Sequence, residues 1–228
     1  MIPARGGSKS ISFKNIIKLN KKPLIEWTFL SLKKSKLIDY TILSTDNKKI
    51  KEVADKNKIE TPFLRPKELS KDNTPMIDVA RHSLNWFKSK FSYYPEYLII
   101  AQPTSPFRDH QDIDKCINII KKNKNIDTVV SITKVPHNFT PPSLMYKSLK
   151  FLKPYKKMNE RKNLKQLKGN FFARNGAIYL SKTKTILDSK TFYGKNIYGY
   201  EMNEIKSTDI DNFEDLKKAE IFMNLNLK

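Results

Sequence analysis

Residues 96–133 read EYLIIAQPTSPFRDHQDIDKCINIIKKNKNIDTVVSIT, and this stretch decides the fold class. Its first part, residues 96–102, is a nearly continuous apolar run, which is typical of a strand buried on both faces. Residues 109–123 place apolar side chains at helical spacing, and residues 127–133 form a second β-rich run. A strand, a helix and a strand in this order predict two strands of a mostly parallel sheet.

The same alternation continues on both sides of this stretch. Helical spacing or helix-forming composition occurs at residues 22–36, 47–58, 74–91 and the last part of 207–225, and strand-like runs occur at 39–46 and 175–181. From about residue 134 to 170 a proline-rich and then charged segment interrupts the pattern, which predicts an inserted arm that acts as a lid or a subunit contact. We therefore expect a single α/β domain over residues 1–228, with helices on both faces of the sheet.

Composition narrows the class of protein. The chain has 228 residues, of which 39% are hydrophobic, so it is long enough to bury a core. No apolar run approaches the roughly 18–20 residues that span a bilayer, and no signal peptide is recognisable. We expect a soluble, cytoplasmic protein without a membrane partner. The lone cysteine, Cys116, lies on the apolar face of a predicted helix and is expected to be buried and structural.

The net charge of +21 raises the hypothesis of a nucleic-acid partner. Only six of the 44 basic residues are arginine, and the lysines are spread over every predicted helix. Charge of this kind solvates a surface in general instead of building one patch. We therefore expect no nucleic-acid partner.

A first polar cluster opens the chain, where residues 2–15 read IPARGGSKSISFKN. Gly6 and Gly7 let backbone amides approach an anion closely. Positive charge comes from three side chains: Arg5, Lys9 and Lys14. The cluster predicts a polyphosphate site, although it matches neither the Walker loop nor the dinucleotide fingerprint. A solvated basic turn is the alternative.

Two further polar clusters follow predicted strands or precede the last helix. Residues 102–108 (QPTSPFR) could be a binding loop or a plain turn before a helix. In residues 207–212 (STDIDN), Asp209 and Asp211 point to the same side if the segment is extended, and paired carboxylates suit Mg²⁺. Alternatively, Asp211 or Asn212 caps the last helix. Because ligands bind beyond the carboxyl ends of parallel strands, we expect the three clusters to converge.

Five blocks of the chain resemble, in order, the signature blocks of the CMP-sialic acid synthetases, also called N-acylneuraminate cytidylyltransferases. They are PARGGSKSISFKN (3–15), RPKELSKDNTP (65–75), AQPTSPFR (101–108), NGAIYL (175–180) and STDIDNFEDLKKAE (207–220). The resemblance implies a Rossmann-like nucleotidyltransferase fold, arranged as a three-layer sandwich, in a homodimer. It also implies that CTP and a nonulosonic acid are the substrates, that Mg²⁺ is the cofactor and that CMP-sugar and pyrophosphate are the products.

The resemblance implies a role for each matching position. Phosphate contacts are implied for the opening turn: Arg5, Gly6, Gly7, Ser8, Lys9 and Lys14. Further nucleotide contacts are implied for Asn15 and Arg65, and metal ligation, with one or two ions, for Asp209 and Asp211. Contacts with the sugar acid are implied for Gln102, Ser105, Lys165, Arg174 and Tyr179. Among all these, the groups expected to stabilise charge in the transition state are Arg5, Lys14 and Asp211. No histidine is assigned a catalytic role.

The chain departs from the family pattern at its start. A full strand normally precedes the opening motif, and here only Met1 and Ile2 do, which predicts either a start further upstream or a reduced strand that a neighbouring segment covers. Ser12 stands where proline is frequent, with little expected consequence.

Several alternatives remain at this level. The sugar acid could be sialate, legionaminate, pseudaminate or 3-deoxy-manno-octulosonate, and residues 135–145 (VPHNFTPPSLM) resemble the legionaminate-type bacterial members. An inactive or truncated homologue and a basic RNA-binding protein are the rivals outside this reaction. The presence of Arg5, Lys14, Asp209 and Asp211 argues against an inactive homologue. The sequence has no clustered platform of aromatic and arginine residues, which argues against RNA binding.

Overall fold

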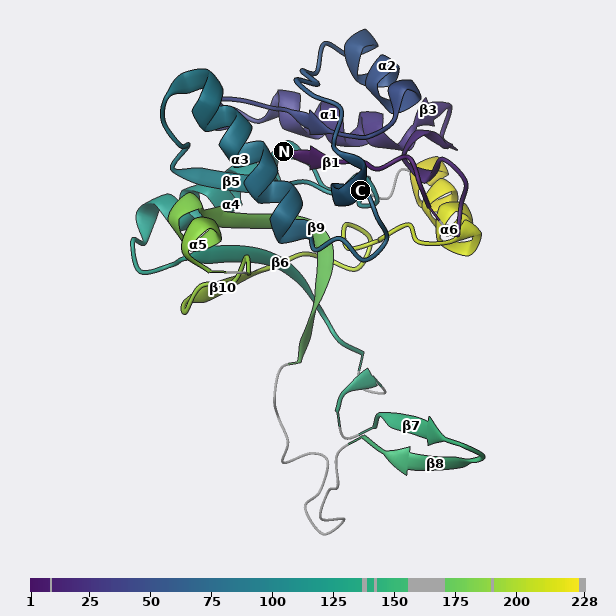
Figure 1. The fold of residues 1–228 in the computed structure, drawn as a ribbon. Helices are drawn as coiled ribbons and strands as arrows, with labels where there is room; N and C mark the ends of the chain where they lie inside the picture. Colours follow the sequence, from purple (N-terminus) through teal and green to yellow (C-terminus); the bar gives the residue numbers. More distant parts are fainter. Residues whose placement is uncertain (9, 137–138, 142, 156–170, 190, 226–228) are drawn as a thin grey trace.

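A mixed sheet forms the centre of the molecule (Figure 1). The computed structural model describes residues 1–8, 10–136, 139–141, 143–155, 171–189 and 191–225. The strands of the sheet are β1 (Ile2–Pro3), β4 (Leu43–Ser44), β5 (Tyr97–Ile100), β6 (Thr128–Lys134), β9 (Phe172–Lys182) and β10 (Ile197–Glu201). Their order is β4-β1-β5-β9-β6-β10, and β9 is antiparallel to both of its neighbours while the other pairs are parallel. The expectation of a mostly parallel sheet is confirmed.

Strand β1 is short, yet it is paired on both sides. Ile2 lies opposite Leu43 of β4. On the other side the amino group of Met1 donates to the carbonyl oxygen of Ile99 at 2.8 Å, and the backbone N–H of Ala101 donates to the carbonyl oxygen of Met1 at 3.2 Å. Residues 2 and 3 thus occupy, between β4 and β5, the strand position that the family pattern places before the opening motif. Its carboxyl end leads directly into the glycine-rich turn.

Helices cover both faces of the sheet. They are α1 (Leu24–Lys34), α2 (Lys48–Lys56), α3 (Met76–Phe91), α4 (His110–Lys122), α5 (Thr183–Asp188) and α6 (Phe213–Asn224), with the 3₁₀ turns η1 (Lys14–Ile16) and η2 (Lys67–Leu69). One core holds side chains of α1, α2 and α4, and the core on the opposite face holds side chains of α3 and α5. Helix α6 packs beside the small hairpin of β2 (Lys18–Leu19) and β3 (Lys22–Pro23) in a third cluster.

Neighbouring residues of the central strands alternate between the two cores. Ile99 packs with α1 and α4, whereas Ile100 packs with α3 and α5. Leu43 and Ile42 alternate in the same way at β4. This period of two is what buried strands require, because successive side chains point to opposite faces. The three-layer α/β arrangement expected from the alternating patterns is confirmed.

Capping side chains set the starts of two helices near the carboxyl edge of the sheet. Asp109 caps α4 and Asn212 caps α6, each in a capping box with the aspartate three residues later. Of the two caps that the sequence left open for the last helix, Asn212 is therefore the one used. The carboxylate of Asp211 is left for another role.

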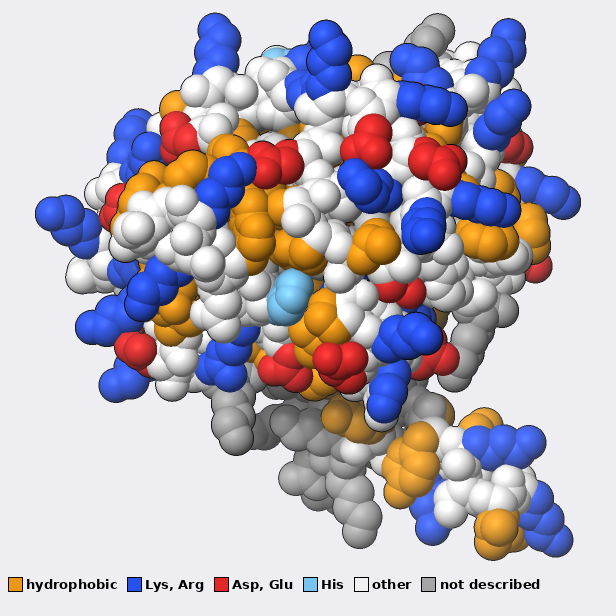
Figure 2. All heavy atoms as spheres, turned by 45° about the horizontal axis from the view of Figure 1, so that its top comes forward, with side chains coloured by type: hydrophobic (Ala, Val, Ile, Leu, Met, Phe, Trp, Pro, Cys, Tyr) orange, Lys and Arg blue, Asp and Glu red, His pale blue; other side chains and the backbone are white. Residues whose placement is uncertain are grey.

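Burial and surface charge match the composition. Cys116 is fully buried in α4, and burial raises the pKa of its thiol, as expected of a structural cysteine. On the face drawn in Figure 2, lysine and arginine side chains are interspersed with acidic and uncharged ones. Within the described ranges, no helix combines the length and apolar character needed to cross a membrane.

The described residues 143–155, between β6 and β9, lie away from the sheet (Figure 1). They contain an antiparallel hairpin of β7 (Met145–Ser148) and β8 (Phe151–Pro154). Several apolar side chains of this hairpin face solvent, among them Leu149, Phe151 and Leu152, and Figure 2 shows such side chains in orange at the lower right. The hairpin interrupts the α/β pattern within the range of the predicted arm, of which residues 156–170 lie outside the described residues.

Candidate functional site

A cleft lies at the carboxyl edge of the sheet, where the glycine-rich turn after β1, the loop after β5 and the loop before α6 meet. Nine of the residues singled out from the sequence line it: Arg5, Gly7, Ser8, Lys14, Asn15, Arg65, Gln102, Asp209 and Asp211. The expected convergence of the three polar clusters is therefore observed. Four other lining residues had been given no role of their own: Pro3, Met76, Pro103 and Thr104.

The opening turn is held in shape by its own polar groups. The side-chain amide of Asn15 donates to the carbonyl oxygen of Arg5 at 2.9 Å, which closes the turn from the inside. Phe13 adopts a left-handed conformation with φ of 52° just before η1. The turn thereby brings the ammonium group of Lys14 to 2.9 Å from Oδ1 of Asp211. Residues almost 200 positions apart in the sequence are joined at this point.

The two glycines of the turn differ in their surroundings. The N–H of Gly6 donates to Oδ1 of Asp46 at 2.8 Å, and Gly6 does not line the cleft. A Cβ on Gly6 would lie 2.6 Å from Nδ2 of Asn47, the cap of α2, so the absence of a side chain serves packing there. Gly7 lines the cleft, and a Cβ on it would meet nothing within 4 Å. The backbone at Gly7 is therefore accessible to the close approach of an anion.

Two arginines line the cleft, and they differ in their exposure to solvent. Arg5 is partly exposed and forms an ion pair with Asp72, in the loop that follows η2. Arg65 is 5% exposed, and its Nε donates to Oγ of Ser44 at 3.1 Å. Burial lowers the pKa of Arg65, and the charge of Asp46 opposes this. A buried guanidinium at the wall of a cleft favours an anionic ligand.

The two aspartates differ strongly in exposure. Asp211 is largely exposed, whereas Asp209 is half-buried and its Oδ1 accepts no hydrogen bond from the part of the chain that the structure describes. Burial raises the pKa of the Asp209 carboxyl, a hydrogen bond from Thr104 opposes this, and the charge of Asp211 adds to it. A buried carboxylate oxygen without a donor is one that a cation would satisfy.

The donor set suits a shared magnesium ion. No group of three or more His, Cys, Asp or Glu side chains that could hold a metal occurs among the described residues. Two carboxylates leave most positions of an octahedral ion to water and phosphate oxygens, which is how Mg²⁺ is commonly held with nucleotides. Asp209 and Asp211 therefore fit Mg²⁺ in company with a polyphosphate.

Gly176 lies at the point where three polar side chains of the site meet. A Cβ on Gly176 would lie 3.0 Å from Oε1 of Gln102, 3.4 Å from Oδ2 of Asp209 and 3.6 Å from Oγ of Ser105. Its φ is +78°, and the register of β6 and β9 shifts beside it, between Val130 and Ile132. The irregular strand thus makes room for the polar groups.

We expect Gly176→Ala to lower the free energy of unfolding by about 1–2 kcal/mol, because an L side chain in the left-handed region is strained. The contact with Gln102 adds to this loss. Urea titration followed by circular dichroism would measure it. Gly7→Ala is the matched control, since open space surrounds that position, and it should change the free energy by less than about 0.5 kcal/mol. Equal effects of both substitutions would contradict the interpretation.

The remaining predicted residues that the structure describes lie outside the lining of the cleft. Ser105 is buried below it, with its hydroxyl unpaired among the described residues. Arg174 donates to the hydroxyl of Tyr193 and stacks on its ring, and the ring of Tyr179 lies 6.5 Å from that of Phe192. Sequence reasoning did not identify Phe192 and Tyr193. Two further predicted residues, Lys9 and Lys165, fall outside the described residues.

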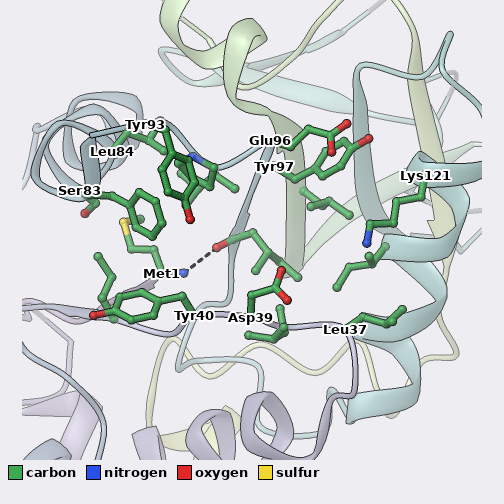
Figure 3. Close-up of a pocket in the computed structure, with 18 residues that line it drawn as sticks. Met1, Leu37, Asp39, Tyr40, Ser83, Leu84, Tyr93, Glu96, Tyr97 and Lys121 are labelled. Atoms are coloured by element: carbon green, nitrogen blue, oxygen red, sulfur yellow. Dashed lines mark hydrogen bonds between the residues drawn. The ribbon is translucent and has the colours of Figure 1, made fainter. Parts of the chain in front are cut away.

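A second pocket lies near the amino ends of β1 and β5, between α3 and α4 (Figure 3). Its lining is mainly apolar and aromatic, with Tyr40, Tyr93 and Tyr97 around the paired Met1 and Ile99. None of the predicted site residues that the structure describes lines it. The cleft at the carboxyl edge is the better candidate, because the glycine-rich cationic turn and the paired aspartates line it together.

A model of the cytidylyltransferase family matches residues 1–226 of the chain. The chain belongs to the cytidylyltransferase family. The predicted resemblance is thereby confirmed at the level of the family. Named relatives and solved structures are also similar to this chain.

Relatives that are 30% identical to this chain include the following two proteins. The N-acylneuraminate cytidylyltransferase of Escherichia coli aligns over 224 residues, which are 96% of this chain and 50% of that protein. The CMP-N,N'-diacetyllegionaminic acid synthase of Legionella pneumophila aligns over 237 residues, covering 99% of this chain and 96% of that protein. The chain thus spans half the length of the first relative and nearly all of the second.

Among solved structures, CMP:2-keto-3-deoxy-manno-octonic acid synthetase in complex with CTP matches this cytidylyltransferase with a TM-score of 0.75. The sequences are 13% identical, and the match covers 99% of this chain and 98% of the other. At this identity the likeness concerns the fold, and it agrees with the Rossmann-like nucleotidyltransferase arrangement expected from the sequence.

Proposed function

We propose that this cytidylyltransferase activates a nonulosonic acid with CTP, releasing pyrophosphate and forming a CMP-linked sugar. The observation that carries the proposal is the meeting of the glycine-rich cationic turn with Asp209 and Asp211 around one cleft. Membership in the family supports CTP as the nucleotide. The names of the two relatives support an acid of the sialic or legionaminic type. We place the reaction in the cytoplasm, where CTP is available.

In the proposed reaction the C2 hydroxyl oxygen of the sugar acid forms a bond to the α-phosphorus of CTP. The bond from that phosphorus to the oxygen it shares with the β-phosphate breaks, pyrophosphate leaves, and the hydroxyl proton is released. Negative charge grows on the α-phosphoryl oxygens and on the leaving group. Cations fixed in advance stabilise that charge more in the transition state than in the ground state.

Different residues of the cleft have different roles in the proposed reaction. Lys14 and Arg5 contact phosphate oxygens, and the backbone of Gly7 and Ser8 allows the triphosphate to approach. Asn15 and Arg65 hold the nucleotide beside Pro3 and Met76 at the wall of the cleft. Their convergence around a single cleft supports these roles.

The magnesium ion is proposed to be held by Asp209 and Asp211. When bound, it would neutralise phosphate charge and favour departure of pyrophosphate. Asp209 contributes the half-buried carboxylate, and Asp211 the exposed one beside Lys14. Metal titration would measure whether one or two ions bind.

The sugar acid is proposed to lie beyond the cleft, toward β9. Gln102 lines the cleft next to Asp209, and Tyr179 and Arg174 follow along β9. Arg174 supplies a charge suited to a carboxylate, and the rings of Tyr179 and Phe192 form an apolar surface. Lys165 of the arm remains a candidate contact.

Incubation of the purified chain with CTP, Mg²⁺ and a panel of nonulosonic acids tests the proposal. Sialate, legionaminate, pseudaminate and 3-deoxy-manno-octulosonate should be compared by pyrophosphate release, with ATP, GTP and UTP as nucleotide controls. We expect release with CTP and with one acid above the others. Absence of release with every acid, in a folded protein that binds Mg²⁺ and CTP, would contradict the proposed activity.

We also propose that the chain forms a homodimer through the arm. An isolated two-stranded hairpin is marginally stable in water, and exposed apolar patches commonly mark interfaces. Leu149 at the tip of the hairpin is 91% exposed and Leu152 is 66% exposed. A second copy of the chain would bury these side chains.

We expect Leu152→Asp to raise the dissociation constant of the dimer by about tenfold or more, because a charge would have to be desolvated at the interface. Sedimentation velocity over a range of protein concentrations measures this. Ile221→Asp on α6 is the matched control, since Ile221 is also an exposed apolar residue, at 56%. An unchanged dimer in the Leu152 variant would locate the interface elsewhere.

A further inference from the structure

The two candidate metal ligands lie on a loop between β10 and α6, residues 203–211, which we call the aspartate loop. Lys206, near its middle, is held by two carboxylates of another element. Its ammonium nitrogen is 2.6 Å from Oδ2 of Asp109 and 2.9 Å from Oδ2 of Asp112. The side chain of Asp112 is 4% exposed, so this is no ordinary surface ion pair.

The partners of Lys206 belong to the first turn of α4. Oδ1 of Asp109 accepts from the N–H of Asp112 at 2.9 Å, and Oδ2 of Asp112 accepts from the N–H of Asp109 at 3.1 Å. The same two carboxylates therefore cap the helix and bind Lys206. Because the cap fixes both carboxylates, Lys206 is attached to a rigid helix start.

The electrostatic surroundings make Lys206 necessary to this group. The hydroxyl of Tyr200 donates to Oδ1 of Asp112 at 2.9 Å, and the charge of Asp112 partly offsets the lowering of the Arg108 pKa by burial. Burial opposes the charged form of Lys206, but hydrogen bonds to Asp109 and Asp112 outweigh it and raise the Lys206 pKa. The positive charges of Lys206 and Arg108 thus offset the negative charges of Asp109 and Asp112 at the base of the aspartate loop. Removal of Lys206 leaves a buried carboxylate short of one partner.

Lys206 lies close to Asp209 in the chain, and its partners on α4 lie close to the loop that carries Gln102. Helix α4 follows directly on the loop that carries Gln102 and Thr104, so Lys206 joins two of the loops that line the cleft. Only two residues separate Lys206 from Asp209. The backbone between them is folded tightly, with the N–H of Thr208 donating to the carbonyl oxygen of Ile205 at 3.1 Å. A shift of Lys206 would therefore move Asp209.

We propose that Lys206 is a positioning residue, which fixes the aspartate loop to the start of α4 and so holds Asp209 and Asp211 in the geometry that a divalent cation requires. This inference rests on the metal-binding role proposed for the two aspartates. Partners that orient metal ligands typically contribute a factor of about 10–100 to metal affinity. The effect of Lys206 should thus be on metal binding before it is on nucleotide binding.

The test measures Mn²⁺ binding by electron paramagnetic resonance, with CTP present and no sugar acid, so that no turnover occurs. Lys206→Met keeps the length of the side chain and removes its charge, and we expect it to raise the dissociation constant of Mn²⁺ by about tenfold. Binding of CTP without metal should change by less than about twofold, and Lys206→Arg should restore most of the Mn²⁺ affinity. Lys218→Met is the matched control, because Lys218 pairs with Glu204 of the same loop at 3.9 Å on the exposed side.

Asp109→Asn provides a second variant if Lys206→Met does not fold. Asparagine keeps the helix cap, so the fold should persist, while the charge that attracts Lys206 is halved. We expect weaker Mn²⁺ binding here too, by less than in Lys206→Met. Unchanged Mn²⁺ affinity in a folded Lys206→Met or in Asp109→Asn overturns the positioning role. If Asp209→Asn nonetheless loses Mn²⁺ binding, the proposed metal site stands without it, whereas a wild-type protein that binds no Mn²⁺ overturns both.

Discussion

Lys14→Ala should lower the rate of pyrophosphate release by a factor of about 10²–10³. Lys14 lies in the cleft with its side chain 15% exposed, and its ammonium group is 2.9 Å from Asp211. A cation held at this place before the substrate arrives needs no reorganisation when charge develops on the α-phosphoryl oxygens. Steady-state kinetics with CTP and the best sugar acid of the panel would measure the loss, mainly as a lower kcat.

Two companion variants make the result on Lys14 specific. Lys18→Ala removes a lysine four positions away that is exposed and does not line the cleft, so activity should stay near that of the wild type. Lys14→Arg keeps the charge but changes its shape, and it should recover part of the rate. If Lys14→Ala retained activity within about threefold of the wild type, transition-state stabilisation by this residue would be refuted.

The meeting of the first two polar clusters could be predicted from the sequence because it depends on topology alone. Once strands alternate with helices, the sheet is mostly parallel, and the segments that follow β1 and β5 must emerge at one edge. Arg5, Lys14 and Gln102 are placed at that edge by their position after a strand, with no knowledge of side-chain contacts. The family blocks then add a role to each position.

Contacts between distant residues could not be predicted in the same way. Lys206 and Asp112 are 94 positions apart, and nothing in a chain with 44 basic residues distinguishes this lysine from the others. The ion pair of Arg5 with Asp72 is equally invisible in the sequence. Such pairs depend on how loops pack, which periodicity does not describe.

Two short strands could not be predicted from the sequence for a related reason. β10 has five residues and little alternation, with exposed Ile197 and Tyr198, so its assignment depends on pairing with β6. β1 has two residues and is defined by its neighbours on both sides. In both cases tertiary hydrogen bonding, and not local propensity, determines the strand.

Asp211→Ala should also lower pyrophosphate release by about 10²–10³-fold, with a higher Mg²⁺ concentration needed for half-maximal rate. The Asp211 side chain is exposed and takes no part in the cap of α6, for which Asn212 supplies the side chain. The loss of activity should therefore come without a large loss of stability. Activity at saturating Mg²⁺ and thermal unfolding should be measured on the same preparation.

The neighbouring residue offers the control that separates metal binding from helix capping. Asn212→Ala removes the cap, whose side chain accepts from the N–H of Asp215 at 2.9 Å, and should cost about 1 kcal/mol of stability. Its effect on the rate should be small, because Asn212 does not line the cleft. The two variants should thus show opposite patterns, with one losing rate and the other losing stability. If Asp211→Ala instead destabilised the protein as Asn212→Ala does and kept its Mg²⁺ dependence, Asp211 would be part of the helix start and not a ligand of the metal.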